Sequence, residues 1–151
     1  MEMIKVRKVW SNNLVQEFNY IKKLLPHHPF VSFDTEFPGT VYPLQNPHVP
    51  PAELYESVKR NVNATNIIQI GITLSNEKTH HVWEFNFNDF DLSRGDLHSP
   101  ESIKLLRSQG IDFDKNAKDG IASQEFVYLM LCSGLLRNNK HIWIGFHIGY
   151  D

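Results

Sequence analysis

The stretch that decides the fold is FVSFDTEF, residues 30–37, a run of aromatic and β-branched residues typical of a β-strand. Successive side chains of a strand point to opposite faces of its sheet. One face would carry, in order, Phe30, Ser32, Asp34 and Glu36. The other face is nearly all apolar and can pack on helices: Val31, Phe33, Thr35 and Phe37. We therefore predict a strand with one core face and one face bearing two carboxylates.

Helices and strands alternate outward from this strand. Helical spacing and capping residues predict helices over 12–25, 51–62, 99–110 and 123–136, with Ser11 or Asn12 as the first cap and Ser99 as the third. Further strands are predicted over 67–74, 80–87 and 141–151, the first two forming a hairpin and the last one buried. Residues 111–120 are expected to be a loop. This alternation predicts an α/β fold around a mixed sheet, in one domain spanning residues 1–151.

Composition narrows the class of protein. The 151 residues are 41% hydrophobic and 21% charged, which is typical of a globular domain. No window holds the roughly 18 to 20 apolar residues of a membrane span, so no membrane partner is expected. The net charge of −2 gives no support to nucleic-acid binding, but bound divalent cations would bring their own positive charge. The single cysteine, Cys132, lies in an apolar stretch and is expected to be buried.

The acidic pair is the main candidate for chemistry. Asp34 and Glu36 would lie about 7 Å apart along one face of the strand. Two like charges beside an apolar run are unfavourable unless a cation lies between them, and oxygen ligands favour Mg²⁺ or Mn²⁺. Asp151, at the end of another predicted strand, could supply the further carboxylate that a two-metal site needs. The alternative is that these residues simply end exposed strands, because a D-x-E pattern is common.

Other catalytic motifs are missing from the sequence. No HExxH, P-loop, G-x-S-x-G or Cys/His zinc spacing is present. His147 would share a strand face with Asp151 and could contact a substrate phosphate, although a structural role is favoured.

Six blocks in order along the chain resemble the CCR-associated factor family, the catalytic deadenylase subunit of the CCR–NOT complex. They are VSFDTEFPG, NIIQIGITLSNE, VWEFNFNDFDL, SIKLLRSQGIDF, GI-x-x-Q-x-F and FHIGYD. The resemblance implies an RNase-H-like fold of the RNase D (DEDD exonuclease) type, with helices on both faces of a mixed sheet. It also implies removal of AMP from the 3′ end of poly(A) RNA, CCR–NOT subunits as partners, and action in the nucleus and cytoplasm.

In this family four acidic residues hold two divalent ions, Mg²⁺ or Mn²⁺. The resemblance assigns the first two positions to Asp34 and Glu36 and the third to Asp151. The fourth aspartate and a histidine that activates water come from later sequence, which this chain lacks. The chain is therefore expected to be an incomplete DEDD exoribonuclease domain with its C-terminal part missing and little or no activity alone. The alternatives are an inactive module that only docks onto complex partners and a plain structural domain.

Overall fold

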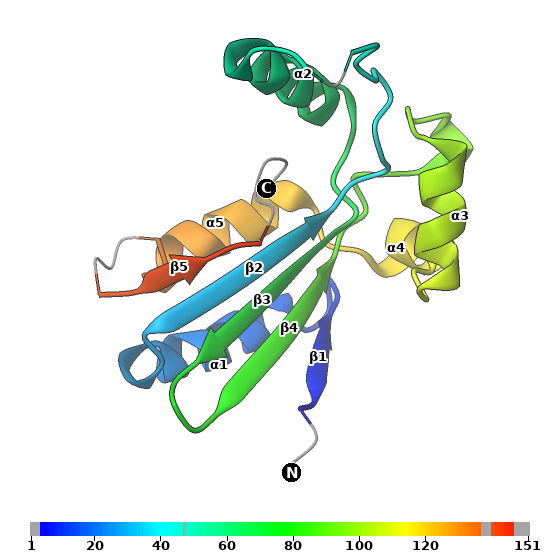
Figure 1. Cartoon of the computed structure of the whole chain (residues 1–151). Coiled ribbons are helices and arrows are strands. Elements are labelled where there is room, and N and C mark those ends of the chain that lie inside the picture. Colours follow the sequence, from blue (N-terminus) through cyan, green and yellow to red (C-terminus); the bar gives the residue numbers. More distant parts are fainter. Residues whose placement is uncertain (1–3, 47, 137–139, 147–151) are drawn as a thin grey trace.

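The computed structural model describes residues 4–46, 48–136 and 140–146. Within them one five-stranded sheet is combined with five α-helices (Figure 1). The elements are, in order, β1 Val6–Val9, α1 Leu14–Leu24, β2 Phe30–Glu36, α2 Pro51–Ala64, β3 Gln69–Ser75, β4 His80–Asn86, α3 Pro100–Ser108, α4 Phe113–Asp119, α5 Ser123–Ser133 and β5 Ile142–Ile144. Short 3₁₀ turns, η1 Leu25–His27 and η2 Leu92–Arg94, follow α1 and β4.

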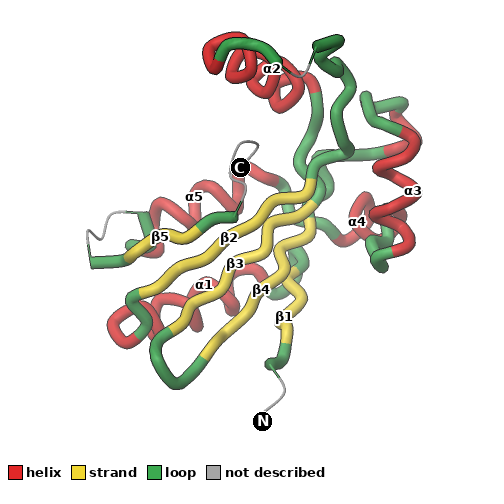
Figure 2. The backbone as a smooth tube through the Cα atoms, viewed as in Figure 1, coloured by secondary structure: helices red, strands yellow, loops and turns green. Residues whose placement is uncertain are grey.

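The sheet has the strand order β1-β4-β3-β2-β5 (Figure 2). In the central group of β4, β3 and β2, β3 is antiparallel to both of its neighbours. The edge strand β1 runs parallel to β4, and the edge strand β5 runs parallel to β2. The predicted α/β fold with a mixed sheet is therefore confirmed. The hairpin is confirmed as well, because β3 pairs with β4 along its whole length.

One face of the sheet forms the main core. Helices α1 and α5 lie side by side across it (Figure 1). The buried side chains come from alternate positions of the strands and from the inner faces of the two helices: Val31, Ile72, Leu74, Trp83, Phe85, Leu14, Phe18, Ile21, Phe126 and Met130. This is the apolar face that the alternation in β2 predicts.

The opposite face of the sheet is polar. Over the described residues it carries no helix, whereas the sequence was expected to place helices on both faces (Figure 1). The reason is chemical, because the three central strands present mostly hydroxyls, amides and carboxylates there, and such side chains gain little from burial. Helices α3 and α4 instead pack beyond one end of the sheet around a second cluster of Ile68, Phe90, Ile103, Leu106 and Phe113.

Several element predictions need correction. The strand β1 was not predicted, and α4 lies where a loop was expected. The first helix is capped by Asn13 rather than by Ser11 or Asn12. Ser99 does cap α3, accepting a hydrogen bond from the Ser102 amide.

Two burial predictions were also wrong. Cys132 is exposed, because α5 turns Phe126, Met130 and Ser133 toward the core and leaves Cys132 on the outside. The last strand was expected to be buried, but Ile142, Trp143 and Ile144 are all exposed. β5 is an edge strand, so its outer edge and its side of the polar face have no neighbour among the described residues.

An ion pair between the partly exposed Arg7 and the buried Glu17 joins β1 to α1. Arg7 donates two hydrogen bonds to Glu17, from Nε at 2.6 Å and from Nη2 at 2.9 Å. The Trp83 indole donates a third to Glu17 at 2.9 Å. Glu17 is only 5% exposed, and these bonds, that of Arg7 first, hold its pKa below the ordinary value. A residue that sequence reasoning would place on a helix surface is therefore the polar centre of the core.

The imidazole of His81 predicts a pH dependence of stability. Burial, together with the neighbouring charges of His28, Arg7 and His80, lowers the pKa of His81 below 6.5. The unfolded chain therefore binds a proton before the folded chain does, and stability falls as the pH drops below 6.5. We expect denaturant midpoints measured at pH 7.5 and 5.5 to differ less in His81→Phe than in the wild type. An equal pH dependence in both proteins would contradict this role.

Candidate metal centre

The carboxyl end of β2 is held in place by the start of α3. Gly39 adopts a φ of 87°, a left-handed conformation that glycine accepts readily. A Cβ atom on Gly39 would lie within 2.9 Å of the Ser99 and Ser102 side chains. The Ser99 amide also donates to the Pro38 carbonyl at 2.9 Å. The chain that leaves Glu36 is thus packed against α3, which makes this end of the strand rigid.

Asp34 and Glu36 lie on the polar face of the sheet, as predicted. Asp34 is exposed and Glu36 is half-buried. Asp34 pairs with Gly71 of β3, and Glu36 pairs with Gln69. Both carboxylates can therefore be reached from solvent over a firm backbone, and their oxygens are the ligands that hard divalent cations prefer.

The surrounding polar face is organised by side-chain contacts. The Gln69 amide donates to the Asn86 side-chain oxygen at 2.8 Å, and Asn86 donates to the Val9 carbonyl at 3.2 Å. Glu84 lies on the same face, two strands away from Asp34, with the Lys8 ammonium at 3.5 Å. Because Lys8 compensates its charge, Glu84 is a weaker candidate ligand than the exposed Asp34.

The third predicted ligand, Asp151, lies outside the described residues, as does His147. Over residues 4–46, 48–136 and 140–146, no three histidine, cysteine or acidic side chains form a group that could hold a metal ion. The structure does place β5 beside β2 and parallel to it, with Ile144 level with Ser32. Two of the three predicted ligands are thus together on one face, and Asp151 remains a prediction.

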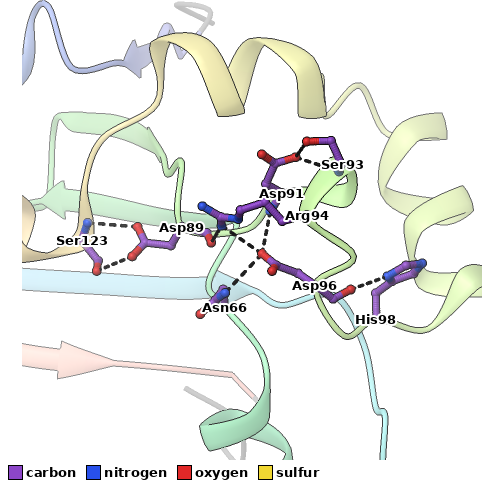
Figure 3. Close-up of polar contacts among 8 residues, drawn as sticks. All are labelled: Asn66, Asp89, Asp91, Ser93, Arg94, Asp96, His98 and Ser123. Carbon is purple, nitrogen blue, oxygen red and sulfur yellow. Dashed lines mark hydrogen bonds and ion pairs between the residues drawn. The ribbon is translucent and has the colours of Figure 1, made fainter.

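A second acidic group follows β4 but has a structural role (Figure 3). Asp89 accepts hydrogen bonds from the amide and hydroxyl of Ser123, at 3.0 and 2.6 Å, and so anchors the start of α5. Asp96 accepts from Arg94 at 3.0 Å, from the Asp91 amide at 2.9 Å and from Asn66 at 3.3 Å. The oxygens of this group are used to organise the loop, so it is not a metal centre.

The pKa shifts in this loop agree with that role. Hydrogen bonds from the Ser93 side chain and amide lower the pKa of Asp91. Burial acts to raise the pKa of Asp96, but the hydrogen bonds from Arg94, Asp91 and Asn66 outweigh it and the net pKa is lowered. Both carboxylates are therefore held ionised by partners within the loop.

Comparison with known proteins identifies the family. The CAF1 family ribonuclease model matches residues 9–127, a stretch that includes both carboxylates of β2 and most of the described fold. The chain belongs to the CAF1 family of ribonucleases. No helix in the described part of this CAF1 chain is long and apolar enough to cross a membrane.

Individual relatives agree with this assignment. The probable CCR4-associated factor 1 homolog 7 of Arabidopsis thaliana is 40% identical over 99% of this chain and 58% of its own length. The poly(A) ribonuclease pop2 of Schizosaccharomyces pombe is 43% identical over 97% of this chain and 45% of its own length. The chain thus spans about half the length of these relatives.

Two solved structures share the CAF1 fold. The S. pombe Pop2p structure, a form with Mg²⁺ and Mn²⁺ bound, superposes with a TM-score of 0.87 and 43% identity, covering 97% of this chain and 60% of Pop2p. The CAF1 chain co-crystallised with the yeast NOT1 MIF4G domain gives 0.75 at 33% identity, covering all of this chain and 59% of the other.

Proposed function

We propose that this chain carries the first acidic pair of a metal-dependent 3′→5′ exoribonuclease. Its substrate would be the poly(A) tail of messenger RNA, its product AMP, and its setting the CCR4–NOT complex in nucleus and cytoplasm. One observation supports this most directly: Asp34 and Glu36 share a solvent-accessible sheet face in a chain of the CAF1 ribonuclease family. The metal-bound form of the related Pop2p supports the choice of Mg²⁺ or Mn²⁺.

The residues fit a site for divalent cations. Asp34 and Glu36 supply hard oxygen donors from one strand, and we propose Asp151 as the third ligand. The parallel pairing of β5 with β2 supports this choice, because β5 runs toward the same end of the sheet as Glu36. Carboxylates from two adjacent strands are the arrangement that a pair of ions about 4 Å apart needs.

The chemistry would be divided between the ions and the protein. When bound, the ions would supply an activated water and neutralise charge on the phosphate and the departing 3′ oxygen. Asp34 and Glu36 would hold that positive charge at a fixed place on a rigid strand. The open polar face would admit a single-stranded RNA end, which reaches the carboxylates without unpairing from a second strand.

A metal titration tests this proposal. We expect Mn²⁺ to raise the unfolding temperature of the wild-type chain, by about 2.7 kcal/mol of added stability at a concentration near 100 times its Kd. Asp34→Asn keeps the size of the side chain but removes the anionic ligand, so its unfolding temperature should respond little to Mn²⁺.

A matched control for this titration is Glu84→Gln. Glu84 lies on the same sheet face but is paired with Lys8, so this variant should respond to Mn²⁺ like the wild type. If the wild-type chain gains no stability from Mn²⁺, or if Asp34→Asn gains as much, the proposed metal centre is wrong.

A docking module without catalysis is the second candidate, and exposed apolar side chains favour it. Tyr128 and Leu131 of α5 and Ile142 and Ile144 of β5 are all exposed. The CAF1 chain that is similar to this one was crystallised with a NOT1 MIF4G domain. A docking module would bind such a domain equally well with and without Asp34→Asn and would release no AMP in Mn²⁺.

A further inference from the structure

The residue paired with Asp34 is a glycine that neither the backbone conformation nor the packing of the described residues requires. Gly71 lies in the middle of β3, between β2 and β4, and pairs with Asp34 on one side and with Glu84 on the other. Glycine in the interior of a strand is destabilising, because it adds backbone entropy to the unfolded state and no packing to the folded one. A central glycine therefore needs a reason.

Backbone conformation does not provide that reason. The described glycines with a positive φ are Gly39, Gly95, Gly110 and Gly134, and Gly71 is not among them. Any L-residue could adopt the extended conformation of Gly71.

Packing inside the protein does not provide it either. A Cβ atom built on Gly71 would have one heavy-atom neighbour within 4 Å, the Asp34 carbonyl oxygen at 3.9 Å, which is an ordinary van der Waals contact. By contrast, a Cβ on Gly120 would lie 2.2 Å from the Asn116 carbonyl oxygen. Among residues 4–46, 48–136 and 140–146 the space above Gly71 is thus open, and a side chain there would extend into it.

The open space adjoins the proposed metal centre. Pairing places Gly71 directly beside Asp34 and two residue pairs away from Glu36, and the two strands are about 4.8 Å apart. Larger side chains border it: Gln69 and Thr73 along β3, and Glu84 across on β4. On the other side of β2, Ile142 and Ile144 of β5 share this face but are level with Phe30 and Ser32 rather than with the carboxylates. Among the described side chains of β3 and β4 around Asp34, the lowest point is therefore at Gly71.

We infer that Gly71 is a substrate-positioning residue, whose missing side chain would make room for the sugar and base of the terminal nucleotide when divalent ions on Asp34 and Glu36 hold its phosphate. This inference rests on the proposed function. A nucleoside joined to that phosphate must extend to one side of β2, and toward β3 the described face leaves room at Gly71. A close approach of ligand to backbone is also one of the common reasons for glycine within a strand.

The test uses a size series at position 71 and two probes, AMP and inorganic phosphate, each titrated in Mn²⁺. Gly71→Ala adds one carbon atom, and Gly71→Val adds a β-branched side chain that suits a strand. Ser75→Val is the matched control, because Ser75 lies on the same strand and face but pairs with Phe30, away from the carboxylates. Stability without ligand and the Mn²⁺ response are measured for every variant.

We expect Gly71→Val to weaken AMP binding by about tenfold or more, and Gly71→Ala by less. Phosphate binding and the Mn²⁺ response should be unchanged, stability without ligand should be unchanged or higher, and Ser75→Val should behave like the wild type. If Gly71→Val does not fold, the inference is tested by the smaller loss of AMP binding that is expected in Gly71→Ala.

Three results would overturn the inference while leaving the metal centre intact. They are wild-type AMP affinity in the Gly71 variants, equal losses of AMP and phosphate binding, and a wild-type chain that binds Mn²⁺ but not AMP. A wild-type chain that does not respond to Mn²⁺ would instead contradict the proposed function itself.

Discussion

Whatever Mn²⁺-dependent release of AMP from oligoadenylate the wild-type chain shows is expected to fall by about a thousandfold in Asp34→Asn, which corresponds to about 4 kcal/mol of lost transition-state stabilisation. The reason is that Asp34 is an exposed carboxylate on the polar face and the proposed ligand, and an amide cannot supply its charge. The measurement is stepwise shortening of a 5′-labelled oligoadenylate at high protein concentration, since the chain alone is expected to turn over slowly or not at all.

Two comparisons make this assay decisive. Glu84→Gln removes a carboxylate from the same face but one that Lys8 compensates, so it should shorten the RNA at the wild-type rate. Shortening that persists in Asp34→Asn, or that occurs without added metal, would contradict the role of Asp34. Shortening by the wild type that Asp34→Asn abolishes would establish the enzyme and overturn the expectation of an inactive chain.

Glu17→Ala should have the largest effect on stability, a loss of about 2 to 4 kcal/mol in the free energy of unfolding. Glu17 is buried and accepts hydrogen bonds from both Arg7 and Trp83. Removing it leaves the buried indole N–H without its acceptor, which is costly, whereas the partly exposed Arg7 guanidinium can turn toward water. Urea denaturation monitored by tryptophan fluorescence would measure the loss.

The matched control for Glu17 is Glu56→Ala on α2. Glu56 is exposed and its nearest ion-pair partner, Lys59, is 3.9 Å away, so its removal should change stability by no more than about 0.5 kcal/mol. Glu17→Gln keeps the shape and loses the charge and should fall between the two. A similar small effect from Glu17→Ala and Glu56→Ala would show that the ion pair of Glu17 contributes little.

The elements with clear local signals could be predicted from the sequence. Alternation in 30–37 placed both the core face and the acidic face of β2 correctly. Ser99 and Pro100 marked the start of α3, and the hairpin of β3 and β4 followed from two β-rich runs with a short connection. In each case the residues that carry the signal lie within a few positions of one another along the chain.

Elements stabilised by distant partners were missed. β1 is four residues long, VRKV, and its charged pattern makes sense only because Arg7 bonds to Glu17 and Lys8 to Glu84. α4 has seven residues and buries only Phe113 and Asn116. Asp112 was a signal for this helix that the sequence analysis missed, because the Asp112 side chain caps the helix by accepting a hydrogen bond from the Lys115 amide. Burial of Cys132 was misjudged because an apolar sequence neighbourhood does not reveal which side of a helix faces the core.

The candidate site likewise has one part that the sequence predicts and another that depends on contacts between distant segments. Asp34 and Glu36 share a face because of strand geometry alone, which the sequence reveals. The openness beside them depends on the pairing of Gly71 with Asp34, which only the register between β2 and β3 defines. Asp151 would have to come from another strand, and its contribution stays a prediction.

The alternation of polar and apolar side chains along β2 also disfavours a misaligned pairing of this strand. A slip of one residue against β3 would turn every side chain of the strand over. Val31 would then meet water while Asp34 and Glu36 entered the layer beneath α1 and α5, where two uncompensated charges are strongly unfavourable. The carboxylates proposed to serve catalysis would thereby make the wrong strand alignment unstable, so that a chain which folds at all presents them outward.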